Sequence, residues 1–480
     1  MISFACALTP TVLPIDSASS ANLIMLTSDE YANYASRTFA IDCPRMILRQ
    51  NISEKPVTYE GPGSIYQAPD GMLKFKLYSA GVCNGSPFEE LRRLLNAKEG
   101  EIIPHSEYFS LNATSIDGRA WHSEFILPKA NYGRGGYGPV VTGNLSGLVN
   151  ETSVPNCPDQ SSSLTLWFAE NFDFPGNIAT TRKTYLGDEE FAISGDWDAA
   201  KFNARELDFT IGKEESWIIL SARSGKNNLP PALSTRICEA LAFTLFRSVS
   251  WTISSKVENG VIATTLRPNS HERKRGASDP PVAFIGSIGG EYVWTLFGCY
   301  LTYVSAHSEP NWHPLSTAVS SVISGSKGDL DLALLTVAVA VESVLKIGFS
   351  EVARPDKAFL AQIQNASELI GKSDLSSPIK LRLSGAVNAM KWPRVKDKLR
   401  VLVENGVFRK ELVAAWESAR NRSVHADALD PMEIAKVFAQ YQAVRTLFNE
   451  IVFLLIGYMG KYKDYSAIGC PEAIFPHKLQ

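Results

Sequence analysis

The amino-acid sequence predicts a multidomain α+β protein, in which a mostly antiparallel, β-rich N-terminal region precedes an all-α helical bundle. The chain has 480 residues, enough for two or three domains that each bury a core. Short runs of alternating apolar and polar residues, separated by Pro, Gly, Asn and Ser, fill its first half. Beyond residue 328, apolar residues instead recur at the three- and four-residue spacing of amphipathic helices.

The expected domain boundaries follow from these changes in pattern. Residues 1–315 form the predicted β-rich region, with a sub-boundary near residue 215. Residues 316–328 are rich in Ser and Gly and are the expected interdomain linker. Residues 329–480 form the predicted helical domain.

The first part of the β-rich region reads as an antiparallel sandwich or barrel. Strands are predicted at Leu73–Tyr78, Leu164–Phe168 and Leu207–Ile211, with a short helical insert at Pro87–Asn96. The glycine-rich stretch Tyr132–Pro139 has neither the GxGxxG spacing nor a following Lys-Ser or Lys-Thr pair. We therefore interpret that stretch as a surface loop and not as a phosphate-binding loop.

From Trp217 onwards the pattern changes. Trp217–Ala222 predicts a buried strand, and Leu233–Val249 predicts an apolar helix. Trp251–Leu266 predicts a hairpin that turns on Asn259-Gly260, because both turn positions need positive φ. The aromatic-rich stretch Val282–Ser305 predicts a further strand.

Two polar features of this region could suggest binding sites, but a structural role is the commoner one for each. The basic stretch His271–Arg275 is either an RNA contact or a solvated turn, and the second is the commoner role of a short charge run. His307 and His313 have no Cys or carboxylate nearby in sequence to complete a set of metal ligands. We expect both histidines to be surface residues or hydrogen-bonded core residues.

The C-terminal helices follow in order. Asp329–Ile347 is apolar on nearly every side, which predicts a central core helix with Gly348 as its C-cap. Further helices are predicted at Pro355–Ile370 and Ile379–Met390, from about Pro393, and from about Pro431 to Tyr458.

Between the last two of these lies Phe408–Pro431, a helical pattern whose apolar face runs into Arg420, Asn421 and His425. Asn421 and His425 are four residues apart and share one helix face. Arg420 and His425 are five apart and point roughly 140° away from each other, so they converge only if the helix ends or bends. Asp430, Pro431 and Glu433 provide the signals for the start of the next helix, which places His425 at or near a helix end.

The segment Arg420-Asn421-Arg422-Ser423-Val424-His425 resembles the motif of the HEPN superfamily, an Arg and a His separated by four to six residues in the penultimate long helix of a helical domain. The resemblance covers residues 325–480, about a third of the chain. Many members are metal-independent endoribonucleases of bacterial defence and toxin systems. A large N-terminal region before a C-terminal HEPN domain is also similar to anti-phage proteins of the ApeA type.

The chemistry of RNA cleavage gives each residue an expected role. Histidine titrates near neutral pH, which suits His425 to proton transfer, and Arg420 suits the phosphate oxygens because it keeps its charge and presents planar donors. Asn421 is expected to fix the imidazole tautomer or to donate to the phosphate. One His per chain cannot easily be both base and acid, and the resemblance implies a dimer, or a higher even oligomer, with two motifs in one cleft.

Supporting residues are expected on two neighbouring segments. Glu342 is the one acid deep inside the helix Asp329–Ile347. It either orients Arg420, as an acid on the first helix does in some family members, or is an ordinary solvated or ion-paired acid. The candidate RNA-binding residues lie on one basic stretch: Lys391, Arg394, Lys396, Lys398 and Arg400.

Composition restricts the compartment and the cofactors. Residues 325–480 carry a net charge of +4 and the rest of the chain −7, which favours the C-terminal part as the RNA-facing part. Seven scattered cysteines without a CxxC pair indicate reduced thiols and no zinc site. We expect a cytoplasmic protein with no metal or other cofactor and no membrane segment or signal peptide.

The resemblance therefore implies a metal-independent endoribonuclease of an anti-phage or toxin-type defence system, with an RNA substrate. Its N-terminal region is expected either to sense a trigger of unknown identity or to recruit substrate. A second hypothesis is a non-catalytic ligand-sensing or adaptor protein that uses the helical bundle for dimerisation. A nucleotide-modifying or protein-modifying toxin partner ranks last, since the chain has no nucleotidyltransferase or kinase motif.

Overall fold

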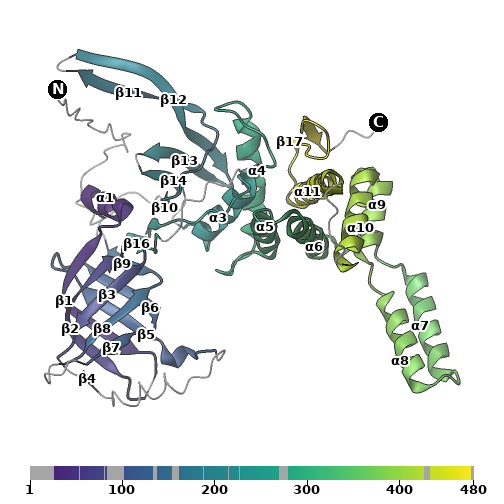
Figure 1. The fold of residues 1–480 in the computed structure, drawn as a ribbon, viewed down its shortest axis with the longest axis horizontal. Coiled ribbons are helices and arrows are strands. Elements are labelled where there is room, and N and C mark those ends of the chain that lie inside the picture. The colour runs from purple at the N-terminus through teal and green to yellow at the C-terminus, as the bar shows by residue number, and fades with distance from the viewer. Residues whose placement is uncertain are drawn as a thin grey trace. The chain divides into compact units, whose positions relative to one another are not determined.

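A computed structural model describes residues 26–52, 54–80, 82–83, 102–132, 138–153, 162–186, 189–214, 216–225, 228–269, 279–425 and 433–476. Within these ranges only the backbone is described for 82–83, 180–186, 189–196 and 422–425. The chain divides into two compact units, Met1–Pro230 with Val249–Arg275, and Pro231–Ser248 with Gly276–Gln480. The first unit is built on an antiparallel sheet and the second is mostly helical, so the fold is α+β (Figure 1).

The first unit begins with helix α1, Ser28–Ser36, where Thr27 and Glu30 form a capping box. Among the described residues its sheet has sixteen strands. The first nine are β1 Ala40–Gln50, β2 Thr58–Gln67, β3 Leu73–Tyr78, β4 Val82–Cys83, β5 Phe109–Thr114, β6 Ala120–Ile126, β7 Lys129–Asn131, β8 Val140–Leu145 and β9 Leu148–Ser153. A short 3-10 helix, His105–Glu107, precedes β5. The other seven are β10 Ser162–Phe168, β11 Ile178–Leu186, β12 Glu189–Ala204, β13 Leu207–Glu214, β14 Trp217–Ser224, β15 Ile253–Glu258 and β16 Val261–Leu266.

Strands that are distant in sequence meet in this sheet. Its order is β11-β12-β13-β14-β10-β15-β16-β9-β6-β5-β1-β2-β3-β8-β7, with β4 paired to β2. The part containing β1 to β3 and β5 to β9 is strongly curved (Figure 1). Its inward residues, among them Ile65, Phe75, Leu111 and Trp121, form one buried cluster. Alternation along each strand therefore places the core on one face and polar side chains on the other.

Several local predictions for this unit are confirmed. The strands predicted at Leu73–Tyr78, Leu164–Phe168 and Leu207–Ile211 lie within β3, β10 and β13. Asn259 and Gly260 connect β15 and β16 with φ of 52° and 72°, which is the left-handed turn that the hairpin required. The predictions for Pro87–Asn96 and His271–Arg275 lie outside the described residues, as does most of Tyr132–Pro139.

The second unit contains helices α3 Leu233–Thr244, α4 Gly290–Val304, α5 Pro314–Gly325, α6 Leu330–Gly348, α7 Lys357–Lys372, α8 Ser377–Ala389, α9 Val395–Glu404, α10 Lys410–His425 and α11 Ile434–Ile456. A two-stranded sheet, β17 Gly460–Lys463 and β18 Glu472–Phe475, follows. The predicted core helix is α6, whose buried residues include Leu334, Val337 and Val341. Gly348 is its last residue and not its C-cap, which is Phe349.

The strand predicted at Val282–Ser305 is wrong, because α4 occupies most of it. Val293, Phe297, Tyr300 and Val304 are buried and recur every three or four residues, which is the period of a helix. Aromatic content suggested a strand, but in this stretch the period was the better guide.

The predicted domain boundaries also differ from the structure. Helix α5 occupies Pro314–Gly325 and buries Leu315, Val319 and Val322, so most of the expected linker 316–328 is a core helix. Near residue 215 the sheet continues, since Glu214 pairs with Trp217. The helical unit instead begins at Pro231, and Val249–Arg275 belongs to the sheet unit. Sequence order misled because α3 enters the helical core before the last hairpin joins the sheet.

Candidate functional site

Helices α6, α10 and α11 form the frame of the candidate site. Trp416 of α10 is buried, and its Nε1 donates to the carbonyl oxygen of Ala338 on α6 at 3.0 Å. On the other side, Gln440 Nε2 of α11 donates to the carbonyl oxygen of Ala415 at 3.1 Å. Helix α10 thus packs against both α6 and α11, which also pack against each other (Figure 1).

Arg420 lies one turn beyond Trp416, where the buried face of α10 ends. Ala419 is fully buried, whereas 57 % of the Arg420 side chain is exposed. Arg420 Nε forms an ion pair with Glu342 Oε1 on α6 at 2.6 Å. Ala338 and Glu342 are one turn apart on α6, and Trp416 and Arg420, which they meet, are one turn apart on α10. The structure therefore brings Glu342 and Arg420 together, a contact compatible with both interpretations of Glu342.

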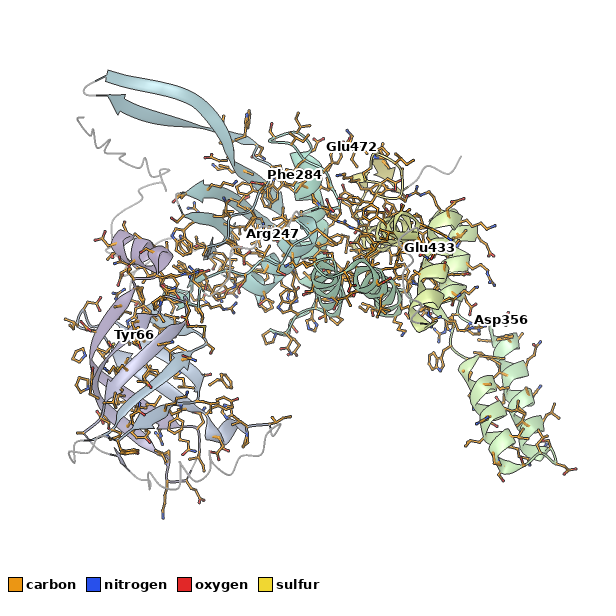
Figure 2. All side chains as sticks on the ribbon, viewed as in Figure 1. Tyr66, Arg247, Phe284, Asp356, Glu433 and Glu472 are labelled. Atoms are coloured by element: carbon orange, nitrogen blue, oxygen red, sulfur yellow. The ribbon has the colours of Figure 1, made fainter. Side chains whose placement is uncertain are left out.

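Asn421 and His425 lie on successive turns of the same helix. Asn421 is exposed, and α10 runs unbroken to His425. The helix end or bend that Arg420 and His425 of one chain need in order to converge is therefore not found between them, and the two positions lie roughly 140° apart around α10. The side chain of His425 lies outside the described part of the structure, as do residues 426–432. The next helix, α11, starts at Ile434 with Glu433 as its N-cap, about three residues later than predicted (Figure 2).

Exposed apolar side chains flank the Arg420–Glu342 pair, which sequence reasoning missed. On α6, Leu332, Leu335 and Val339 are each between 40 % and 53 % exposed. They recur at helical spacing on one face, and Glu342 occupies the next position on it. Ile434 and Phe438, in the first turns of α11, are about half exposed. Exposed apolar side chains that follow one helix face in this way are typical of a protein interface.

Lys398 corrects part of the predicted RNA-binding stretch. It is 6 % exposed, and its Nζ donates to the carbonyl oxygen of Leu345 at 3.1 Å. This carbonyl belongs to the last turn of α6, where backbone acceptors have no intrahelical partner. Burial, followed by the nearby charge of Lys346, lowers the pKa of Lys398. Lys398 is thus a helix-capping residue, because α9 turns this position towards α6.

The other four candidates are exposed: Lys391, Arg394, Lys396 and Arg400. Two of them have acidic neighbours. Arg394 Nε lies 3.4 Å from Asp397 Oδ2, and Lys396 Nζ lies 3.0 Å from Glu417 Oε2. Lys396 and Arg400 are four residues apart, so both positive charges lie on the same face of α9.

His313 is a structural histidine, as expected. Its Nδ1 accepts a hydrogen bond from the backbone N–H of Leu315 at 3.0 Å and so caps α5. The backbone N–H of His313 donates to Glu239 Oε1 at 2.8 Å, and Glu239 also forms a buried ion pair with Arg236. Burial, with smaller contributions from His307 and Arg236, lowers the pKa of His313 to about 4.

Within the described residues, no three His, Cys, Asp or Glu side chains are grouped so as to hold a metal ion. The helices described there include none with the length and apolar character needed to cross a membrane. Comparison of the chain with protein-family models, with curated proteins and with solved structures found no match.

Proposed function

We propose that the chain is a metal-independent endoribonuclease of the HEPN type, acting in an anti-phage or toxin-type defence system. In this proposal Arg420 and His425, with Asn421, cleave RNA at the interface of a homodimer. The N-terminal region, which carries most of the negative charge, restrains the site until it meets a trigger.

The observation that carries the proposal is the position of Arg420. A guanidinium at the end of a buried helical face, more than half exposed and held by Glu342 Oε1 at 2.6 Å, is both oriented and reachable. Glu342 is only 21 % exposed and holds the guanidinium from a neighbouring helix, so the pair fixes Arg420 across the contact of α6 with α10. The same helix carries Asn421 and His425 within the next two turns.

The apolar side chains around this position support a dimer. Leu332, Leu335 and Val339 lead along α6 to Glu342, and Phe438 lies on the neighbouring helix. A second copy that covered them would bury this surface and bring its own Arg420 close. Two copies would then supply two His425 residues, one as the base and one as the acid, whereas one chain has only one.

The reaction is an internal transfer at phosphorus. One His425 accepts the proton of the RNA 2′-hydroxyl, whose oxygen attacks the adjacent phosphorus. The bond to the 5′-oxygen breaks, and the partner subunit's His425 protonates that oxygen. Arg420 stabilises the charge on the non-bridging oxygens. The products are a 2′,3′-cyclic phosphate and a 5′-hydroxyl, and DNA is spared because it has no 2′-hydroxyl.

The proposal is tested with purified full-length protein and RNA in the presence of EDTA. Cleavage should persist with the chelator and fall by about a hundredfold or more in Arg420→Ala and His425→Ala. Arg354→Ala is the matched control, since Arg354 is also exposed and paired with an acid, Glu351, at 2.7 Å. Cleavage that requires added Mg²⁺, or that survives both substitutions, would refute the proposed chemistry.

A second candidate is a ligand-sensing adaptor without catalysis. The Arg420–Glu342 ion pair favours this function, because Glu342 already balances the charge of Arg420 without a bound phosphate. In that case the apolar surface on α6 and α11 would serve only for dimerisation. The biological effect of the protein would then survive His425→Ala, whereas the ribonuclease proposal requires its loss.

A further inference from the structure

Two rows of side chains cross four neighbouring strands on the outer face of the first unit. Strands β9, β6, β5 and β1 are adjacent in the sheet. The residue pairing aligns four outward residues in the first row: Ile47, Asn112, His122 and Val149. Two residues away, Arg45 pairs with Thr114 and Thr114 with Ala120. The register of β6 and β9 places Glu151 at the end of this second row. The intervening residues, such as Met46, Ala113 and Trp121, are buried in the core.

The two rows line a hollow of about 490 Å³. The hollow is open to solvent, so a ligand in it would lie against the strands and would not be enclosed by them. Thr114 and Ala120 are small and occupy the middle of the second row, so the surface is low there. The larger residues Arg45 and Glu151 stand at its two ends.

The two ends of this row have opposite charge. Three interstrand spacings, about 14 Å, separate the strands that carry Arg45 and Glu151. An arginine binds a phosphate group through its planar donors, and a carboxylate accepts hydrogen bonds from amino groups. Arg45 pairs with Glu60 at 3.0 Å, but both side chains are largely exposed, so a phosphate can displace this partner.

The first row offers a surface for a flat ring. His122 Nδ1 lies 2.9 Å from Asn112 Oδ1, and His122 Nε2 lies 3.2 Å from Glu124 Oε1. These two contacts hold the imidazole from both sides. The apolar side chains of Ile47 and Val149 lie at the two ends of the same row. Bases stack on aromatic side chains with little regard to sequence.

We propose that this face binds the 5′-phosphate of a cytosine nucleoside, with the phosphate at Arg45, the base over His122 and the N4 amino group at Glu151. The separation of the two charged ends excludes a single amino acid, whose carboxylate and ammonium groups are attached to one carbon atom. A glutamate that accepts from the N4 amino group of cytosine is a known pairing in base recognition. Binding of the nucleotide does not depend on RNA cleavage. Only the further idea that this nucleotide is the trigger of the ribonuclease rests on the proposed function.

The test measures binding of CMP, UMP and cytidine to the full-length protein by equilibrium dialysis. CMP and UMP differ at the amino group, and cytidine lacks the phosphate. CMP should bind with a Kd below about 1 mM, and UMP and cytidine at least tenfold more weakly. Arg45→Ala should abolish the preference for CMP over cytidine, and Glu151→Ala the preference for CMP over UMP.

Arg49→Ala is the control, because Arg49 is exposed two positions beyond Ile47 on the same face of β1 and does not line the hollow. It should leave all three affinities unchanged. Unaltered melting temperatures would show that each variant folds. No binding of CMP at about 1 mM, or an equal loss in Arg49→Ala and Arg45→Ala, would overturn the site whether or not the protein cleaves RNA.

Discussion

Single residues of α10 and α6 define the candidate site more sharply than the motif did. Ala419 is buried and Arg420, the next residue, is exposed, so the helix changes from core to surface within one position. Glu342 meets Arg420 because α6 packs against α10. The spacing of residues in the sequence indicates which side chains share one face of a helix. It does not indicate which acid of another helix contacts that face.

Replacing Glu342 separates a positioning role from a purely structural one. Glu342→Gln keeps the size of the side chain and removes its charge, so Arg420 should lose its orientation. We expect kcat for RNA cleavage to fall about tenfold with little change in KM, and the unfolding free energy to change by less than about 1 kcal/mol, since the pair is partly exposed. Glu342→Asp should restore part of kcat. An unchanged kcat would assign the ion pair to structure alone.

His313 makes stability depend on pH. Its folded pKa of about 4 lies below the ordinary value of 6.5, so the unfolded chain binds a proton more readily between these values. The unfolding free energy should therefore fall as the pH falls from 6.5 to 4, by about 1–2 kcal/mol after allowance for solvent screening. Protonated Nδ1 can no longer accept the N–H of Leu315.

The variant His313→Asn tests this pH dependence. Asparagine is a favourable N-cap residue and does not titrate. Chemical denaturation at several pH values between 7 and 4 should show a smaller loss of stability in the variant than in the natural protein. Equal losses would assign the acid sensitivity to other groups.

At the scale of elements, periodicity was a better guide than composition. The aromatic stretch that forms α4 and the Ser-rich stretch that forms α5 both have apolar residues at helical spacing. Their residue types suggested a strand and a linker. Helices α7 and α8, which pack chiefly against each other, were placed to within about two residues, and Asp356 caps α7 (Figure 2).

The junction of α9 with α6 provides a matched pair of lysines. Lys398→Ala removes a buried hydrogen bond to the end of α6, so the unfolding free energy should fall by about 1–3 kcal/mol. Lys396→Ala removes an exposed ion pair with Glu417 and should cost less than about 1 kcal/mol. Urea denaturation of the two variants measures the difference. Equal costs would contradict the capping role of Lys398.

For the whole molecule, the central question is whether two chains share one site. The exposed surface formed by Leu332, Leu335 and Val339 ends at Glu342. A single copy leaves it open to water. The proposed ribonuclease is incomplete until a second chain covers it.

A charge placed on this surface should separate assembly from folding. Val339→Glu is expected to convert a dimer to a monomer in sedimentation experiments and to abolish RNA cleavage, because it would bury a carboxylate in the interface. Leu381→Glu is the control, since Leu381 is 77 % exposed on α8, away from the α6 surface. A natural protein that sediments as a monomer at all concentrations would exclude the shared site.

The sequence by itself determined the α+β class, most of the local elements, the Asn259-Gly260 turn and the helix that carries Arg420, Asn421 and His425. These depend on periodicity and turn chemistry within a few residues. Only the tertiary structure decided that Glu342 meets Arg420, that Lys398 is buried and that ten residues of four strands line one hollow. Such contacts depend on pairing and packing between distant segments, whose register no local pattern encodes.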